Sequence, residues 1–278
     1  GRGDQKGAWR VAAVMFATGV ASWALVAAHV WADWEVYLLV MGLSWAGFQG
    51  GLVGLLYLAI EPFIRRYWPD ALISWMRMVN GRFRDPLTAS HLLVGVSAGL
   101  VTRLLVGVAV WATNDLTDET TSSSMSGARF LFGDLLENLV LWAFVATGII
   151  LILVLLRSVV RRTWVADALC VVLLSLVLAP PFPVSITAIA GWLPGVLGLA
   201  MDVWILRRFG LLALTATVCV YGLLKAGPLA VASWYAAYSL TTPTLLAAAA
   251  AWSLYVILTS RPGTASRFTR NAGIKRLW

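Results

Sequence analysis

Long apolar stretches alternate with short polar segments along the whole chain. Each stretch approaches the roughly 20 residues that a helix needs to cross a bilayer. The pattern predicts an all-α, polytopic membrane protein of about eight spans, at residues 9–31, 36–60, 90–113, 131–156, 164–180, 192–206, 209–224 and 244–260. Proline breaks and short lengths in the fifth to seventh stretches also allow a re-entrant segment, so six spans remain an alternative.

The basic residues favour one orientation in the membrane. Of 21 Lys and Arg residues, 18 lie in five clusters: 3 before the first span, 5 after the second, 3 after the fourth, 2 after the sixth and 5 after the last. The positive-inside rule then places both termini in the cytoplasm. We expect a bacterial cytoplasmic (inner) membrane, with anionic lipids at its cytoplasmic face as partners and a basic cytoplasmic tail at 261–278.

Composition excludes a soluble globular domain. Hydrophobic residues make up 60% of the chain and charged ones 12%, against roughly 45–50% and about 25% in soluble domains. The net charge of +8 lies in short loops beside apolar spans, where it attracts lipid head groups. No nucleic-acid partner is therefore expected, and the state of oligomerisation, including a homo-oligomer, is left open.

No motif predicts catalysis on this chain. It contains no GxGxxG, HRD or DFG sequence, and no Cys, His, Asp or Glu spacing that suits a metal. The segment 95–99, Gly-Val-Ser-Ala-Gly, superficially resembles the serine motif of intramembrane proteases. No histidine lies deep in another span to act as its base, so a small-residue packing face is the favoured interpretation. We predict no catalytic, cofactor or metal site.

Four charged residues inside or beside the spans form a candidate intramembrane polar relay. Arg103 lies well inside the third span, where an unpaired charge costs at least about 2.5–3.5 kcal/mol. Glu137 and Asp134 open the fourth span and are candidate partners, while snorkelling of Arg103 to the outer surface is the alternative. Asp202 in the sixth span is either a buried polar hub or, as favoured, a partner of the arginines at 207–208.

A second candidate site is the cytoplasmic connector after the second span. Glu61 and Pro62 mark either a helix end, the default for proline, or a hinge. Residues 69–81 are amphipathic, with Leu72 and Trp75 on one face and Ser74 on the other, and predict a short interfacial helix that stops at Gly81. The predicted connector residues are Glu61, Pro62, Arg65, Arg66, Arg82, Arg84 and Asp85.

The stretch from Tyr57 to Leu87 contains Glu-Pro at 61–62, Arg-Arg at 65–66, Trp-Pro at 68–69 and Gly-Arg-Phe-Arg-Asp-Pro at 81–86. With these features it resembles part of the multi-pass C-terminal membrane region of acidobacterial-type bacterial serine/threonine protein kinases. Gly-Arg-Gly-Asp at 1–4 and Trp-Tyr-Ala at 234–236 are similar to that region too. The resemblance implies a soluble kinase domain before the membrane part, and the absence of an initial Met also suggests a piece of a longer protein.

The resemblance implies that the parent protein binds ATP and Mg and phosphorylates Ser or Thr, although no kinase residue falls on this chain. The chain would then be a membrane anchor and signal-sensing domain, whose third and fourth spans sense the outer side while the connector signals to the kinase domain. The alternative function is a membrane subunit of a transporter or channel, suggested by the breaks near 180–183 and at Pro194. An intramembrane enzyme is a third hypothesis, disfavoured because a catalytic pair is lacking.

Overall fold

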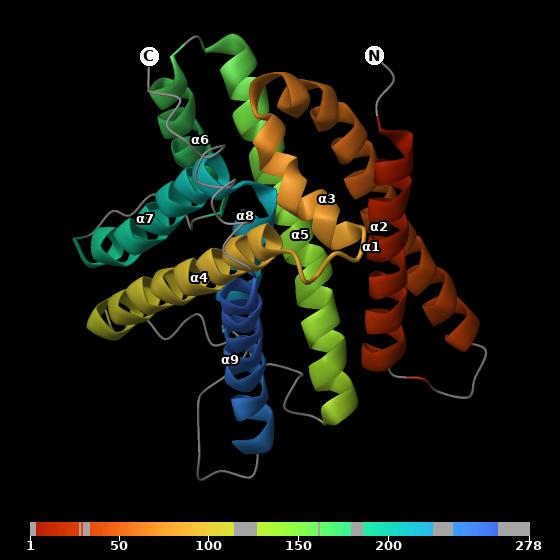
Figure 1. Cartoon of the computed structure of the whole chain (residues 1–278). Helices are drawn as coiled ribbons and strands as arrows, with labels where there is room; N and C mark the ends of the chain where they lie inside the picture. The colour runs from red at the N-terminus through yellow and green to blue at the C-terminus, as the bar shows by residue number, and fades with distance from the viewer. Residues whose placement is uncertain are drawn as a thin grey trace.

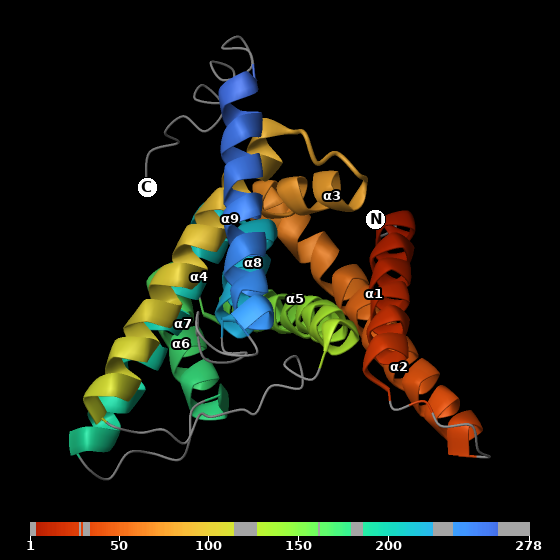
Figure 2. The same cartoon turned by 90° about the horizontal axis from the view of Figure 1, so that it is seen from below.

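The computed structural model describes residues 4–27, 29, 34–113, 127–160, 162–178, 186–224 and 236–260. These residues form helices and no strand (Figures 1 and 2). The elements are α1 (Gln5–Val26), α2 (Trp34–Tyr67), the 3-10 turn η1 (Pro69–Leu72), α3 (Ile73–Val79), α4 (Pro86–Thr113), α5 (Ala128–Val159), α6 (Thr163–Leu178), α7 (Ile186–Phe209), α8 (Leu211–Leu223) and α9 (Ala236–Thr259).

Five of these helices, α1, α2, α4, α5 and α9, are long and apolar enough to cross a membrane. Two shorter apolar helices, α6 and α8, add to them. Each of the eight predicted stretches coincides with a helix, which confirms a helical protein of membrane-spanning character. The number of crossings and the side on which the termini lie remain predictions, and the predicted tail at 261–278 lies outside the described residues.

Apolar side chains cover much of the outer surface of the helices. Trp111, Val159 and Leu258 are each about 80% exposed, and soluble monomers rarely carry extended apolar patches. Such a surface is stable against lipid, which agrees with the composition.

Helix α2 continues past the point where the sequence suggested its end. It runs 34 residues and contains Pro62, whose side chain is exposed. Proline removes one backbone hydrogen bond, and long apolar helices tolerate that loss. The default interpretation of Glu61-Pro62 as a helix end was therefore wrong. Pro194 likewise lies inside α7, so that predicted break is absent.

The predicted amphipathic helix at 69–81 is present as η1 followed by α3, and Gly81, with φ 77°, follows its end. Leu72 and Trp75 are buried as predicted. Ser74, which the pattern placed on the polar face, is also fully buried. Its hydroxyl has a buried partner, described below, which a count of apolar positions cannot reveal.

Helix α8 lies at the centre of the molecule (Figures 1 and 2). Every residue from 211 to 220 is buried, as expected of a helix that is apolar on all sides. It packs against α4, α5 and α7, while α4 also packs against α7 and α9. On the other side, α1 packs against α2 and α5.

Glycines allow α4 to approach α8 closely. A Cβ atom on Gly95 would lie 2.6 Å from the carbonyl oxygen of Ala213, and one on Gly99 would lie 2.6 Å from that of Thr217. Ser97, between them, is exposed. The small-residue packing face is thus confirmed, since only glycine fits at these two positions.

Candidate functional site at the basic end of the helices

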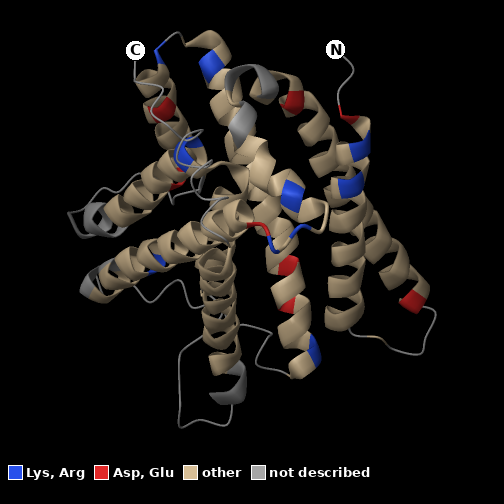
Figure 3. Cartoon of the chain, in the orientation of Figure 1, with Lys and Arg blue, Asp and Glu red and all other residues tan. Residues whose placement is uncertain are grey.

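Basic residues gather where the N-terminal end of α1, the α3 region and the C-terminal end of α5 lie (Figure 3). We call this the basic end. By the positive-inside rule it is the predicted cytoplasmic side. Most of the polar contacts between different elements lie here, so it is the candidate functional site.

Glu61 of α2 contacts the residue that precedes α1. Its side chain is only 2% exposed, and its Oε2 atom accepts a short hydrogen bond from the backbone N–H of Asp4. Asp4 in turn caps α1, because its Oδ1 atom accepts a hydrogen bond from the N–H of Gly7 at 2.9 Å. A carboxylate buried among apolar helices is thereby hydrogen-bonded, which lowers the cost of its burial.

A second contact links α1 to the connector. The Arg10 guanidinium donates a short hydrogen bond to Oδ1 of Asn80, the residue that ends α3. The first turns of α1 therefore contact the connector at two positions, Glu61 and Asn80, which lie 19 residues apart in the sequence.

A small cavity lies beside Glu61. Its volume of about 10 Å³ has room for a single water molecule. Tyr57, Trp75 and Thr147 line it together with apolar side chains. The indole Nε1–H of Trp75 is buried and has no hydrogen-bond partner among the described residues. The cavity can hold at most a water molecule between Glu61 and Trp75.

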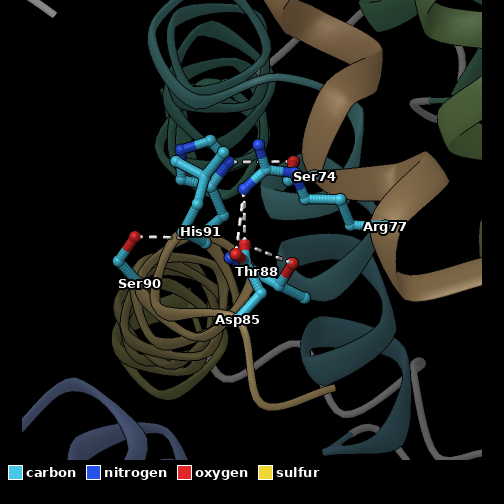
Figure 4. Close-up of polar contacts among 7 residues, drawn as sticks. Ser74, Arg77, Asp85, Thr88, Ser90 and His91 are labelled. Atoms are coloured by element: carbon cyan, nitrogen blue, oxygen red, sulfur yellow. Dashed lines mark hydrogen bonds and ion pairs between the residues drawn. The ribbon is translucent and has the colours of Figure 1, made fainter. Parts of the chain in front are cut away.

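Figure 4 shows the polar network that joins α3 to the start of α4. Nδ1 of His91 and Oγ of Ser74 share a hydrogen bond at 2.9 Å. Nη1 of Arg77 donates to both carboxylate oxygens of Asp85 at 2.9 Å. Asp85 also accepts from the backbone N–H of Thr88 at 3.2 Å and so caps α4. Because Ser74 is fully buried, the Ser–His pair fixes α3 on α4 and offers no exposed nucleophile.

A charged cluster at the same end joins α5, α6 and α7 to Trp68, which lies between α2 and η1. Nη2 of Arg157 lies 3.3 Å from Oδ1 of Asp167, and Arg207 forms an ion pair with Oδ2 of the same carboxylate. The Arg157 guanidinium also stacks over the ring of Trp68, 3.6 Å from its centroid. One aspartate on α6 therefore balances arginines from α5 and α7. The sequence analysis did not identify Asp167, although its position just after the short α5–α6 connection could have indicated it.

The structure does not bring the predicted relay residues together. Arg103 and Glu137 form no ion pair among the described residues, because α8 lies between α4 and α5. Asp134 lies in the second turn of α5, and its backbone carbonyl accepts a hydrogen bond from the side-chain amide of Asn138, one turn later in the same helix. Asp202 is buried, and its Oδ1 atom has no hydrogen-bond partner in the described structure. The favoured pairing of Asp202 with the arginines at 207–208 was therefore wrong, since Arg207 pairs with Asp167.

The connector residues have different surroundings. Glu61 and Asp85 are hydrogen-bonded as described, and Pro62 lies inside α2. Arg82 and Arg84 are exposed. Arg65 and Arg66 belong to α2, but their side chains lie outside the described part of the structure. The contacts of the connector thus come mainly from Glu61, Ser74, Arg77, Asn80 and Asp85, of which the sequence analysis chose Glu61 and Asp85 as connector residues.

At the opposite end, His29 follows α1 and contacts the first turn of α2. Its Nδ1 atom lies 2.5 Å from Oε1 of Glu35, and its Nε2–H donates to the carbonyl of Ala24 at 3.0 Å. Hydrogen bonds from both ring nitrogens favour the imidazolium form. The hydrogen bond to Glu35, followed by that to Ala24, raises the pKa of His29 above 6.5.

We expect NMR titration of the His29 ring to give a pKa above 6.5. Glu35→Gln should lower this pKa toward 6.5, whereas Arg129→Gln should raise it slightly, because the charge of Arg129 opposes protonation. The contact between the His29 imidazolium and Glu35 stabilises the folded state fully at pH values below the pKa of His29 in the unfolded chain. This stabilisation is lost as the pH rises through the higher pKa of His29 in the folded state. A His29 pKa that Glu35→Gln leaves unchanged would contradict the contact.

No family model, curated protein or solved structure matches this chain.

Proposed function

We propose that this chain is the membrane anchor and signalling connector of a bacterial serine/threonine protein kinase whose catalytic domain precedes it. The observation that carries the proposal is the pair of contacts that α1 makes with the connector, through Glu61 and Asn80. A domain attached before residue 1 would enter the membrane part at this position. The sequence resemblance at 57–87 supports the kinase as that domain.

The network around Ser74, Arg77, Asp85 and His91 supports a coupling role for the connector. It fixes α3 on α4, while α3 also contacts α1. The first residues of α4 and helix α1 both contact α3, so this short helix connects them. Coupling of this kind typically changes an equilibrium about 5- to 150-fold.

A transporter or channel subunit has less support from the geometry. The transporter hypothesis rested on two predicted helix breaks, near 180–183 and at Pro194. Helix α7 continues through Pro194 without a break. The predicted break at 180–183 lies outside the described residues. Flux of ions or amino acids into liposomes that contain only this chain would favour the transporter.

The proposal is tested first by the reading frame upstream of Gly1. An in-frame kinase domain is expected there, and a frame without one would refute the kinase tether. The second test measures autophosphorylation of the natural full-length protein in membrane vesicles, in the presence of ATP and Mg. Glu61→Leu removes the acceptor that holds Asp4, and we expect it to lower the activity at least about fivefold at equal membrane abundance.

Glu35→Gln is the matched control, because Glu35 is the glutamate at the other end of α2, far from the connector. It should leave autophosphorylation within about twofold of the wild type. Glu61→Gln keeps a hydrogen-bond acceptor at this position, so its autophosphorylation activity should lie between those of Glu61→Leu and Glu35→Gln. Equal activities of all three variants would show that the α1–connector contact does not transmit a signal.

A further inference from the structure

An open groove lies at the basic end between the α3–α4 linker and α9. Residues 81–85 of the linker and Trp252 of α9 line it. Its volume of about 610 Å³ is within the roughly 300–1,000 Å³ of sites that bind small molecules. Figure 2 shows the linker beside the C-terminal half of α9. The groove shares Asp85 with the polar network described above, whereas its other lining residues take no part in that network.

The groove carries two positive charges that nothing in the described structure neutralises. Arg82 and Arg84 are exposed and form no ion pair there. The neighbouring carboxylate of Asp85 does not neutralise them, because Arg77 contacts both of its oxygens at 2.9 Å. The Arg84 guanidinium lies 5.9 Å from the ring centroid of Trp252, and both residues line the groove. An anion is the ligand that complements this charge.

Apolar surface continues from the groove along α9. Phe83 is 58% exposed and Trp252 is 42% exposed. Leu245 and Ala248, seven and four residues before Trp252, are exposed on the same face of the helix. Aromatic rings beside arginines are typical of the head-group level of a bilayer. A ligand that fits this surface has an anionic head and an apolar body.

We infer that the groove formed by Arg82, Phe83, Arg84 and Trp252 binds the phosphate head group of an anionic phospholipid. Guanidinium groups match phosphate oxygens in a planar, two-point geometry. The acyl chains would lie along Leu245 and Ala248 of α9. The inference requires that the helices lie in a bilayer, and it does not depend on what precedes Gly1.

The test uses the whole chain in nanodiscs of phosphatidylcholine with and without phosphatidylglycerol, and counts retained lipids by native mass spectrometry. Affinity is titrated with short-chain phosphatidylglycerol and, separately, with inorganic phosphate. Each arginine near the surface contributes about 1 kcal/mol, or about fivefold. The R82Q/R84Q variant should therefore bind short-chain phosphatidylglycerol about 30-fold more weakly than the wild type. Both side chains are exposed, so folding should be unaffected, as circular dichroism can verify.

R162Q/R208Q is the matched control, because it removes two exposed arginines from the basic end outside the groove. It should bind within about twofold of the wild type. Equal weakening in both double variants would overturn the inference, since attraction would then come from the general surface charge. Inorganic phosphate binding as tightly as the lipid, with the same dependence on the arginines, would also overturn it, because the site would then recognise a free anion.

Discussion

Replacing Gly99 with leucine is expected to lower the free energy of unfolding by about 3 kcal/mol. Its Cβ atom would lie 2.6 Å from the carbonyl oxygen of Thr217 and 2.6 Å from Cβ of Val220. Backbone cannot move aside as a side-chain tip can, so α4 must separate from α8. Overpacking of this kind costs typically about 1–3 kcal/mol, and occasionally more where backbone is involved. Unfolding by SDS, followed by circular dichroism of the purified chain, measures the change.

Gly107→Leu is the control for this prediction. Gly107 lies two turns further along α4, and a Cβ atom there would meet nothing within 4 Å. The variant should stay within about 0.5 kcal/mol of the wild type. If Gly99→Leu and Gly107→Leu unfold alike, the close approach of α4 and α8 would be wrong.

The apolar stretches predicted the helices well, because length and hydrophobicity alone decide whether a segment forms a helix in lipid. They did not predict which helices pack together. The expected pairing of Arg103 with Glu137 assumed that consecutive spans are neighbours. In the structure α8 lies between α4 and α5, and only the glycines at 95 and 99 indicated that α4 has a close partner.

The polar contacts of the basic end were harder to predict than its charge. The sequence indicated arginine clusters, and it singled out Glu61, which the structure shows buried and hydrogen-bonded to the backbone of Asp4. It did not indicate that Ser74 is buried against His91, because burial of a hydroxyl depends on a partner from another helix. For the same reason Asp202 was assigned to the nearby arginines, whereas Arg207 pairs with Asp167 on α6.

This shared carboxylate supports the second large effect, which is expected for Asp167→Ala. The variant leaves Arg157 and Arg207 close together without a counter-charge. The Arg157 side chain is only 14% exposed and stacked on Trp68. Removing one partner of such a pair costs about 3–5 kcal/mol when it is fully buried, and we expect about 3 kcal/mol here because Arg207 reaches water. The same SDS unfolding measurement applies.

Two further variants separate loss of charge balance from loss of packing. Arg207→Gln leaves the Arg157–Asp167 pair intact and removes a more exposed partner, so its cost should be below about 1 kcal/mol. The double variant R157M/D167L replaces the pair with apolar side chains and should recover most of the stability lost in Asp167→Ala. If the double variant is less stable than Asp167→Ala, the cluster stabilises the junction of α5, α6 and α7 through its hydrogen-bond geometry. The explanation from an uncompensated charge would then be wrong.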